Sequence, residues 1–463
     1  MPDILLTHGY FLFEDEKELE IMKPYPTLGL LYISAYLRRA GFDVAIFDST
    51  FADRETLYAR LHREPRGVLG LYTNLMTRVA VVQIMAEAKR SGWRVLVGGP
   101  EAGNYPEQYL NHGADAVVVG EGEATLVELL PALAKHGPHR LHGINGVVFR
   151  DDSGGIVVNP ERSRIADIDS IPWPDRHLID TQRYVDVWRE HHGMGSVNLI
   201  TVRGCPYRCK WCSHGVFGFS YRRRDPRDCV DEVAFIRETY RPDQVWYADD
   251  VFTINHRWLH SYAEELKRRA IRLPFETISR ADRMMKEEVL ETLAEMGCYR
   301  IWIGSESGSQ RVLDAMQRGV TVEQVEWAMK AAQRHGIAVG MFLMWGYEGE
   351  TEEDIEATIA HVKRCNPDVF LTTVSYPIKA TPYFDQVADR IAADRDWAVS
   401  TDRDCRIKGR HSRRYYRHAD RWLRNEVAAY RLEPTDPDTA RTKRLAALEA
   451  RRDMRAAERE VEA

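Results

Sequence analysis

The sequence has little that would suit a membrane protein or a secreted protein. None of its apolar runs approaches the roughly 18 residues that a helix needs to cross a bilayer. Its first residues lack the basic segment and the apolar core of a secretory signal. We therefore expect a cytoplasmic protein with no membrane partner.

Positive charge is not in excess either. The 463 residues include 64 Lys and Arg against 70 Asp and Glu, which gives a formal net charge of −6. Because nucleic-acid binding depends on a basic surface, this balance disfavours a nucleic-acid partner. Apolar residues make up 44% and charged residues 29% of the chain, which is an ordinary globular composition. At roughly 100–200 residues per domain, the length predicts two to four domains.

Cysteine is scarce, and its distribution is uneven. The count is seven, an odd number, which in a large chain without a signal argues against a framework of disulfide bonds. Four cysteines are scattered, and we expect them to be ordinary semi-buried thiols. The other three, Cys205, Cys209 and Cys212, fall within eight residues. This cluster argues for a metal centre.

The first 140 residues alternate short apolar strands with helices. Such alternation predicts a parallel, doubly wound sheet, and sheets of this kind bind ligands beyond the carboxyl ends of their strands. The expected strands cover residues 3–8, 43–48, 67–72, 94–97 and 116–119. The small or flexible residues at their ends are Thr73, Gly98, Gly99, Gly120 and Gly122.

The remainder of the chain divides into three further parts. Residues 141–195 are expected to be a connector that includes a hairpin over 146–158. Residues 196–391 repeat strand and helix six times, which predicts a partial α/β barrel with its chemistry on the loops after the strands. Residues 392–463 are expected to form a small, helical, Arg-rich region. The overall prediction is an α/β protein with a Rossmann-like domain at 1–140 and a barrel of the (β/α)6 type.

The three clustered cysteines have the spacing C-x3-C-x2-C on a loop after an apolar strand. A structural zinc site needs four ligands, so zinc remains an alternative only with His214 as the fourth. A ferredoxin cluster would need four thiolates, and the next cysteine, Cys229, lies 17 residues beyond Cys212. Three thiolates on a 4Fe-4S cluster leave one iron open, as catalytic metal sites do.

This segment resembles the radical S-adenosylmethionine (radical SAM) superfamily. The family motif has an aromatic residue just before the third cysteine, and Trp211 occupies that position. Polar or flexible segments that resemble the same family follow the next four barrel strands, at residues 247–252, 276–282, 303–308 and 343–351. The resemblance implies that the three cysteines hold a 4Fe-4S cluster whose open iron is chelated by the amine and carboxylate of S-adenosylmethionine (SAM).

The first 140 residues resemble the cobalamin-binding domain that precedes the barrel in many radical SAM enzymes. The matching pieces are residues 28–32, 40–44, 97–100 and 119–123. The sequence is similar to the class that contains the anaerobic magnesium-protoporphyrin ester cyclase and cobalamin-dependent methyltransferases. It departs from many cobalamin proteins because it lacks an Asp-x-His-x-x-Gly signature; neither His8 nor His112 fits one. The resemblance implies cobalamin with its lower face unligated or bound to water. The alternative is a sheet domain that has lost cobalamin or binds another ligand.

The resemblance also implies contacts with cobalamin. The corrin would lie at the ends of the strands of the first sheet. The residues expected there are Thr73, Gly98, Gly99, Gly120 and Glu121.

Two residues are expected to hold the ends of SAM. Trp211 offers a flat apolar edge to the adenine, although it could instead be core packing. Arg280 suits bidentate pairing with the methionyl carboxylate, although it could instead form a surface ion pair with Asp282.

Three further strand ends are expected to complete the SAM site. Asp249 or Asp250 would accept hydrogen bonds from the α-amino group, or would cap the following helix. Ser305 or Glu306 would bind ribose hydroxyls, or would belong to a turn. Gly346 would allow the backbone to approach the adenine closely.

The expected activity is reductive cleavage of SAM to modify an unactivated centre of a small-molecule substrate. Methyl transfer is favoured because it is the commoner outcome in this class, and an oxidative cyclase of the porphyrin ester cyclase type is the first alternative. A flavodoxin or ferredoxin is the expected external electron donor. The second alternative, from another class, is a non-enzymatic iron-sulfur sensor or binding protein. The missing fourth cysteine and the negative net charge disfavour it.

Overall fold

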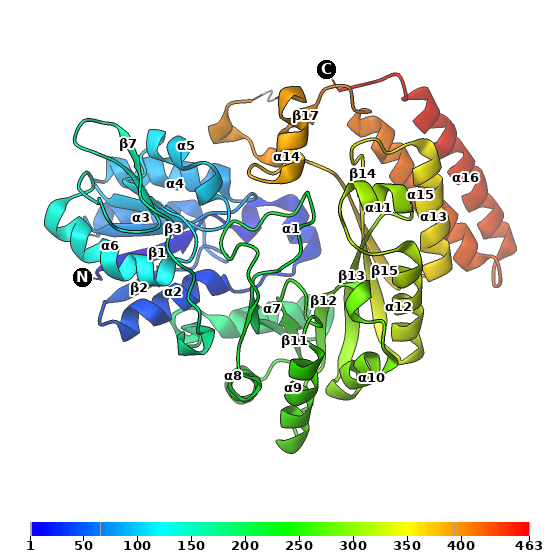
Figure 1. The fold of residues 1–463 in the computed structure, drawn as a ribbon, viewed down its shortest axis with the longest axis horizontal. Coiled ribbons are helices and arrows are strands. Elements are labelled where there is room, and N and C mark those ends of the chain that lie inside the picture. Colours follow the sequence, from blue (N-terminus) through cyan, green and yellow to red (C-terminus); the bar gives the residue numbers. More distant parts are fainter. Residues whose placement is uncertain (1, 65, 393–394, 463) are drawn as a thin grey trace. The chain divides into compact units, whose positions relative to one another are not determined.

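The computed structural model describes residues 2–64, 66–392 and 395–462 (Figure 1). The chain divides into two compact units. The first unit comprises Met1–Pro206, Ser213–Trp246 and Arg395–Arg403. The second unit comprises Tyr207–Cys212, Tyr247–Asp394 and Asp404–Ala463. The four segment boundaries expected from the sequence remain a prediction.

A seven-stranded sheet forms the centre of the first unit. Its strand order is β2-β1-β3-β4-β5-β6-β7. The strands are β1 (Ile4–His8), β2 (Val44–Phe47), β3 (Val68–Tyr72), β4 (Arg94–Gly98), β5 (Ala116–Val118), β6 (Val147–Arg150) and β7 (Ile156–Val158). The first five pair in parallel, whereas β6 and β7 pair antiparallel. The hairpin that the sequence assigned to a connector therefore extends the sheet, because β6 pairs with β5.

Helices cover both faces of this sheet, as expected for a doubly wound fold. On one face, α2 (Leu28–Arg39) and α6 (Gly122–His136) pack Leu30, Leu37 and Leu126 into one apolar cluster. On the other face, a second cluster contains apolar residues of α3 (Arg54–Arg63), α4 (Arg78–Arg90) and α5 (Pro106–Asn111). The even burial of the parallel strands explains why they read as continuous apolar runs.

Six strands form the second large sheet, in the order β15-β14-β13-β12-β11-β8. The strands are β8 (Ser196–Leu199), β11 (Gln244–Tyr247), β12 (Phe275–Ser279), β13 (Cys298–Glu306), β14 (Ala338–Trp345) and β15 (Val369–Val374). The helices between them are α8 (Pro226–Tyr240), α9 (His256–Arg268), α10 (Glu287–Met296), α11 (Gln310–Ala315), α12 (Val322–Arg334) and α13 (Glu352–Cys365). This repeat confirms the six strand–helix units expected from the sequence.

The remaining elements are short, apart from two C-terminal helices that pack against each other (Figure 1). These two are α15 (Arg413–Leu432) and α16 (Pro437–Ala456). The others are α1 (Glu16–Ile21), α7 (Thr181–His192), β9 (Val202–Arg203), β10 (Arg222–Arg223), α14 (Pro382–Val387), β16 (Ile391–Ala392) and β17 (Arg406–Ile407). Across the described residues, every helix is too short or too polar to span a membrane.

A buried cation fastens a late segment of the chain, Arg395–Arg403, within the first unit. The side chain of Arg78 is only 2% exposed and forms ion pairs with Glu101 and, at 2.7 Å, with Asp402. The hydroxyl of Tyr105 donates a second hydrogen bond to Asp402 at 2.6 Å. Both carboxylates are buried, so their ion pairs with Arg78 offset part of the cost of removing them from water.

We expect R78M to destabilise the first unit by about 3 kcal/mol, because it removes the buried cation that pairs with Glu101 and Asp402. Thermal unfolding followed by circular dichroism should show a Tm lower by about 6 °C or more. R90M is the matched control, since Arg90 pairs with Glu87 from an exposed position on the same helix. Equal shifts in the two variants would contradict the role assigned to Arg78.

Candidate cofactor sites in the two units

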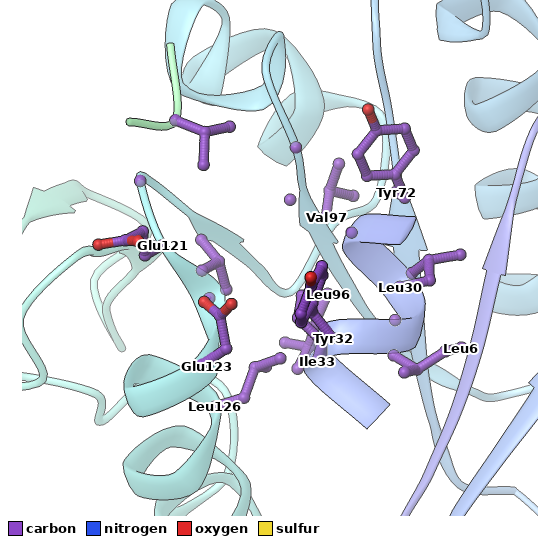
Figure 2. A pocket seen from close by; sticks show the side chains of 18 of the residues that line it. Leu6, Leu30, Tyr32, Ile33, Tyr72, Leu96, Val97, Glu121, Glu123 and Leu126 are labelled. Carbon is purple, nitrogen blue, oxygen red and sulfur yellow. The ribbon is translucent and has the colours of Figure 1, made fainter. Parts of the chain in front are cut away.

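A cavity opens in the first unit where β3, β4 and β5 end (Figure 2). It has an empty volume of about 810 Å³, counting the part that is open to solvent. Leu30 and Ile33 of α2 form part of its wall, and Leu96 and Val97 of β4 form another part. The wall is therefore mainly apolar, as expected of a pocket for a large organic cofactor.

Several glycines line this cavity, where the absence of side chains leaves space for a ligand. Gly99 has a φ of +114°, and a Cβ there would lie 2.3 Å from the carbonyl oxygen of Thr73, so only glycine fits. A Cβ on Gly98 would make only ordinary contact with Val118, at 3.6 Å. Because Gly98 lines the cavity, a larger side chain there would occupy part of its volume. Gly120, with a φ of +80°, lines the same wall.

Two acidic residues line the side of the cavity formed by the start of α6 (Figure 2). Arg203 donates to Glu121 at 2.8 Å and to Glu123 at 2.6 Å, and Arg222 donates to Glu121 at 2.8 Å. Burial opposes ionisation of Glu121, but the hydrogen bonds from Arg222 and Arg203 hold the pKa of that carboxyl below its ordinary value. The carboxylate of Glu121 is therefore charged, and Arg203 pairs with both acids within the wall.

From the sequence alone Arg203 has no definite role, and the structure places it at the cavity. It lines the cavity, and its guanidinium lies 5.2 Å from the ring centroids of both Tyr32 and Phe217. Its position in the sequence, on β9 and two residues before Cys205, was the available signal. Arg203 therefore links the wall of the cavity to the segment that begins the cysteine loop.

Four of the five residues expected to contact cobalamin line this cavity: Gly98, Gly99, Gly120 and Glu121. Thr73 is not among the lining residues. Its hydroxyl is 2.9 Å from that of Tyr109, and it donates to Glu101 at 3.4 Å. The glycine-bounded, mainly apolar wall fits an extended ring system such as cobalamin, and the contacts themselves remain a prediction.

The cysteine loop divides between the two units. In the first unit, Cys205 is buried and follows Gly204, whose Cβ would lie 2.5 Å from the carbonyl oxygen of Ser220. In the second unit, Cys209 is buried and Cys212 is exposed. In the described ranges, no group of three or more His, Cys, Asp or Glu side chains is arranged to hold a metal ion. The ligand role of the three cysteines is therefore a prediction from their spacing.

Within the second unit, the surroundings of Cys209 suit an anionic centre. Arg280 directs Nη1 at its sulfur over 3.7 Å, and Arg318 does so over 4.0 Å. Both guanidiniums are buried. A cluster held by thiolates is electron-rich, so two buried cations beside one of the sulfurs are compatible with it.

Arg280 also makes the ion pair with Asp282 that the sequence analysis kept as an alternative, at 2.9 Å. Its Nη2 donates to the carbonyl oxygen of Arg318 at 2.8 Å. Trp211 is half-buried and packs against an apolar cluster that includes Met316 and Tyr347. The contacts of Arg280 and Trp211 with SAM remain predictions.

The other residues expected at the SAM site have distinct environments. Asp249 is buried and Asp250 is exposed. The hydroxyl of Ser305 is 3.0 Å from Nε2 of His361, so it already has a partner within the protein. Glu306 has a φ of +62°, which is uncommon for a residue with a side chain. Burial raises its pKa, although nearby guanidiniums oppose that shift.

Gly346 begins the loop after β14 and has a φ of +70°. Its N–H donates to Glu350 at 2.6 Å, and its carbonyl oxygen accepts from Ser375 at 2.5 Å. A Cβ there would lie 2.8 Å from the ring of Tyr416 on α15. Glycine is therefore required by packing at this turn, and its approach to adenine remains a prediction.

Two family profiles match the chain. The profile of the Radical SAM superfamily matches residues 199–362, and that of the B12 binding domain matches residues 20–130. The chain therefore belongs to the radical SAM enzymes that carry an N-terminal B12-binding domain, as the sequence analysis expected.

Curated relatives span most of the chain. An uncharacterized methyltransferase of Pyrococcus horikoshii is 28% identical over 83% of this chain and 84% of its own. The anaerobic magnesium-protoporphyrin IX monomethyl ester cyclase of Rubrivivax gelatinosus is 26% identical over 80% of this chain and 68% of its own. The cytidylyl-2-hydroxyethylphosphonate methyltransferase of Streptomyces wedmorensis is 28% identical over 72% of both chains.

Solved structures share the fold. The radical SAM methyltransferase TsrM from Kitasatospora setae, with cobalamin and a [4Fe-4S] cluster bound, has a TM-score of 0.69 and 19% identity, covering 87% of this chain and 81% of its own. The cobalamin-dependent radical SAM enzyme OxsB, with aqua-cobalamin bound, has a TM-score of 0.73 and 16% identity. The match covers 100% of this chain and 77% of the OxsB chain.

Family membership defines the cofactors and the general chemistry. The protein is a cobalamin-dependent radical SAM enzyme whose cofactors are a 4Fe-4S cluster, SAM and cobalamin. Enzymes of this kind require a small substrate and a reductant. The fold class, the family and the cofactors expected from the sequence are thereby confirmed.

We expect G98V to lower the affinity for hydroxocobalamin by about tenfold or more. The valine would occupy part of the cavity, and the cofactor would therefore lose several buried contacts. Equilibrium dialysis of the full chain with hydroxocobalamin measures this. G155V is the control, since Gly155 lies in an exposed turn of the same unit. Unchanged binding by G98V would show that cobalamin does not use this cavity.

Proposed function

We propose that this enzyme transfers a methyl group from SAM to an unactivated carbon or phosphorus centre of a small molecule. The observation that carries the proposal is the glycine-bounded cavity of the first unit, in a chain that also has the C-x3-C-x2-C loop. A cofactor able to accept and pass on a methyl group would bind there. Two of the relatives described above are named as methyltransferases, which supports the same outcome.

The residues of the chain would divide the work between the two units. In the first unit, Arg203 and Glu121 would keep the wall of the cobalamin cavity in shape. Cys209 and Cys212 of the second unit would bind the cluster together with Cys205 of the first unit. When bound, the cluster would supply low-potential electrons and an iron position for SAM. The protein then positions SAM and excludes water from it.

Further side chains are proposed to orient SAM. Trp211 would lie along the adenine, Asp249 would accept from the α-amino group, and Glu306 would bind the ribose. Asp249 suits this role better than Asp250 because it is buried. Arg280 would remain within reach of the carboxylate, but most of its donors already have partners.

An oxidative cyclisation is the second candidate. The magnesium-protoporphyrin ester cyclase of Rubrivivax gelatinosus matches this chain nearly as well as the methyltransferases do. A cytoplasmic location and an electron donor of the flavodoxin or ferredoxin type complete the proposal.

Isotope labelling separates the two outcomes. The holoenzyme is incubated with candidate substrates, a reductant and SAM labelled in its methyl group. A methyl transferase would give a labelled product together with S-adenosylhomocysteine or 5′-deoxyadenosine. An unlabelled, oxidised product would support the cyclase instead. If neither 5′-deoxyadenosine nor S-adenosylhomocysteine forms with any substrate, both enzymatic proposals are wrong.

The cysteine assignment has its own test. Alanine at Cys205, Cys209 or Cys212 should abolish the brown cluster absorption and the cleavage of SAM, because each removes one of three thiolate ligands. C365A is the control, since burial raises the pKa of Cys365 to about 12 and keeps it a neutral thiol. Iron and activity retained in the triple variant would refute the assignment.

A further inference from the structure

The sulfur of Cys209 is approached by two buried arginines from different parts of the second unit. Arg280 follows β12, and its Nη1 lies 3.7 Å from Sγ. Arg318 follows α11, and its Nη1 lies 4.0 Å from the same sulfur. The two arginines are only 3% and 6% exposed. Burying two cations at one sulfur would be unfavourable unless negative charge accumulates there.

The direction of the Arg280 guanidinium is fixed by its other contacts. Its Nε donates to Asp282 at 2.9 Å, and its Nη2 donates to the carbonyl oxygens of Arg318 at 2.8 Å and of Gly319 at 3.3 Å. The ring of Tyr207 stacks against it, with 3.7 Å between Cζ and the ring centroid. Only Nη1 is left to face the sulfur.

Arg318 is held in a comparable way. Its Nε and Nη2 donate to the carbonyl oxygen of Gly304 at 3.2 and 2.8 Å. A Cβ on Gly304 would lie 2.9 Å from Nη2, so glycine makes room for the guanidinium. The nearest carboxylate, that of Glu306, is 3.9 Å away. The charge of Arg318 is therefore only weakly compensated.

We propose that Arg280 and Arg318 are positioning residues for the Cys209 sulfur, and that their charges stabilise the reduced form of the cluster bound there. This inference rests on the proposed cluster ligation. An external reductant would deliver one electron to a cluster bound there, which would add one negative charge beside these arginines. The added negative charge interacts favourably with buried cations because screening by water is weak there. Cations beside the sulfur therefore make the cluster easier to reduce.

The test is a redox titration of the reconstituted holoenzyme. The cluster is reduced stepwise with dithionite and viologen mediators, and the reduced form is counted by its electron paramagnetic resonance signal. We expect R318M to lower the ratio of reduced to oxidised cluster at a given potential by about tenfold, equal to about 59 mV for one electron. R318K keeps the charge and should stay within about threefold of the parent.

Two further variants test the charge argument against a structural role. R283M is the matched control: Arg283 contacts Tyr207 and Asp282, but in the described part of the chain it does not contact the sulfur. It should leave the ratio nearly unchanged. D282N removes the acid that faces Arg280, so it should raise the ratio, in the direction opposite to R318M. If R318M fails to load a cluster, D282N still decides the question.

The possible outcomes separate this inference from the proposed function. If the parent chain forms no 4Fe-4S cluster on reconstitution, the proposed ligation is wrong and the inference falls with it. If the cluster forms, equal ratios in R318M and R283M overturn the inference alone. An R318K variant that behaves like R318M, or a D282N variant that lowers the ratio, also overturns it, because either result would show that geometry and not charge is responsible.

Discussion

The first unit depends on one buried guanidinium, that of Arg203, which holds the carboxylates of Glu121 and Glu123 together. A buried carboxylate without a partner costs several kcal/mol, so neither acid could occupy the cavity wall alone. Glu121 and Glu123 begin the helix that follows β5, where the cavity opens. Arg203 lies one residue before Gly204, which precedes Cys205. The shape of the cavity and the start of the cysteine loop are therefore set by the same ion pairs.

Arginine is used in this way at several places where distant segments meet. Arg78 joins residues 395–403 to helix α4 within the first unit. Arg176 pairs with the buried Glu232 at 3.1 Å. Arg280 links the segment after β12 to the segment after α11 through its hydrogen bonds. The planar guanidinium can serve several acceptors at once and keeps its charge when buried, which lysine does less well. Each of these contacts therefore fixes an orientation as well as a distance.

The sequence predicts most of the fold because its parallel strands are short apolar runs that end in glycine or polar residues. It also predicts the cavity glycines, since Gly98, Gly99 and Gly120 follow strands. It does not predict that Thr73 lies outside the cavity lining. That outcome depends on the turn at Gly99, where the carbonyl oxygen of Thr73 lies close to the glycine. Arg203 lies close to Cys205 in the sequence, but neither its role nor that of Arg318 could be predicted, because partners such as Glu121 and Gly304 are remote in the chain and only the tertiary fold brings them together.

The charges at the two sites are balanced differently, and this difference follows what each would bind. At the cavity, Glu121 and Glu123 are offset by Arg203 and Arg222, so the wall is close to neutral and can accept an apolar ring system without a further counter-ion. At Cys209, Arg280 pairs with Asp282, whereas the contact of Arg318 with the carboxylate of Glu306 is as long as 3.9 Å. Positive charge is thus left in excess around the sulfur. Such an excess is stable only beside a group that brings negative charge of its own, as thiolates on an iron-sulfur cluster do.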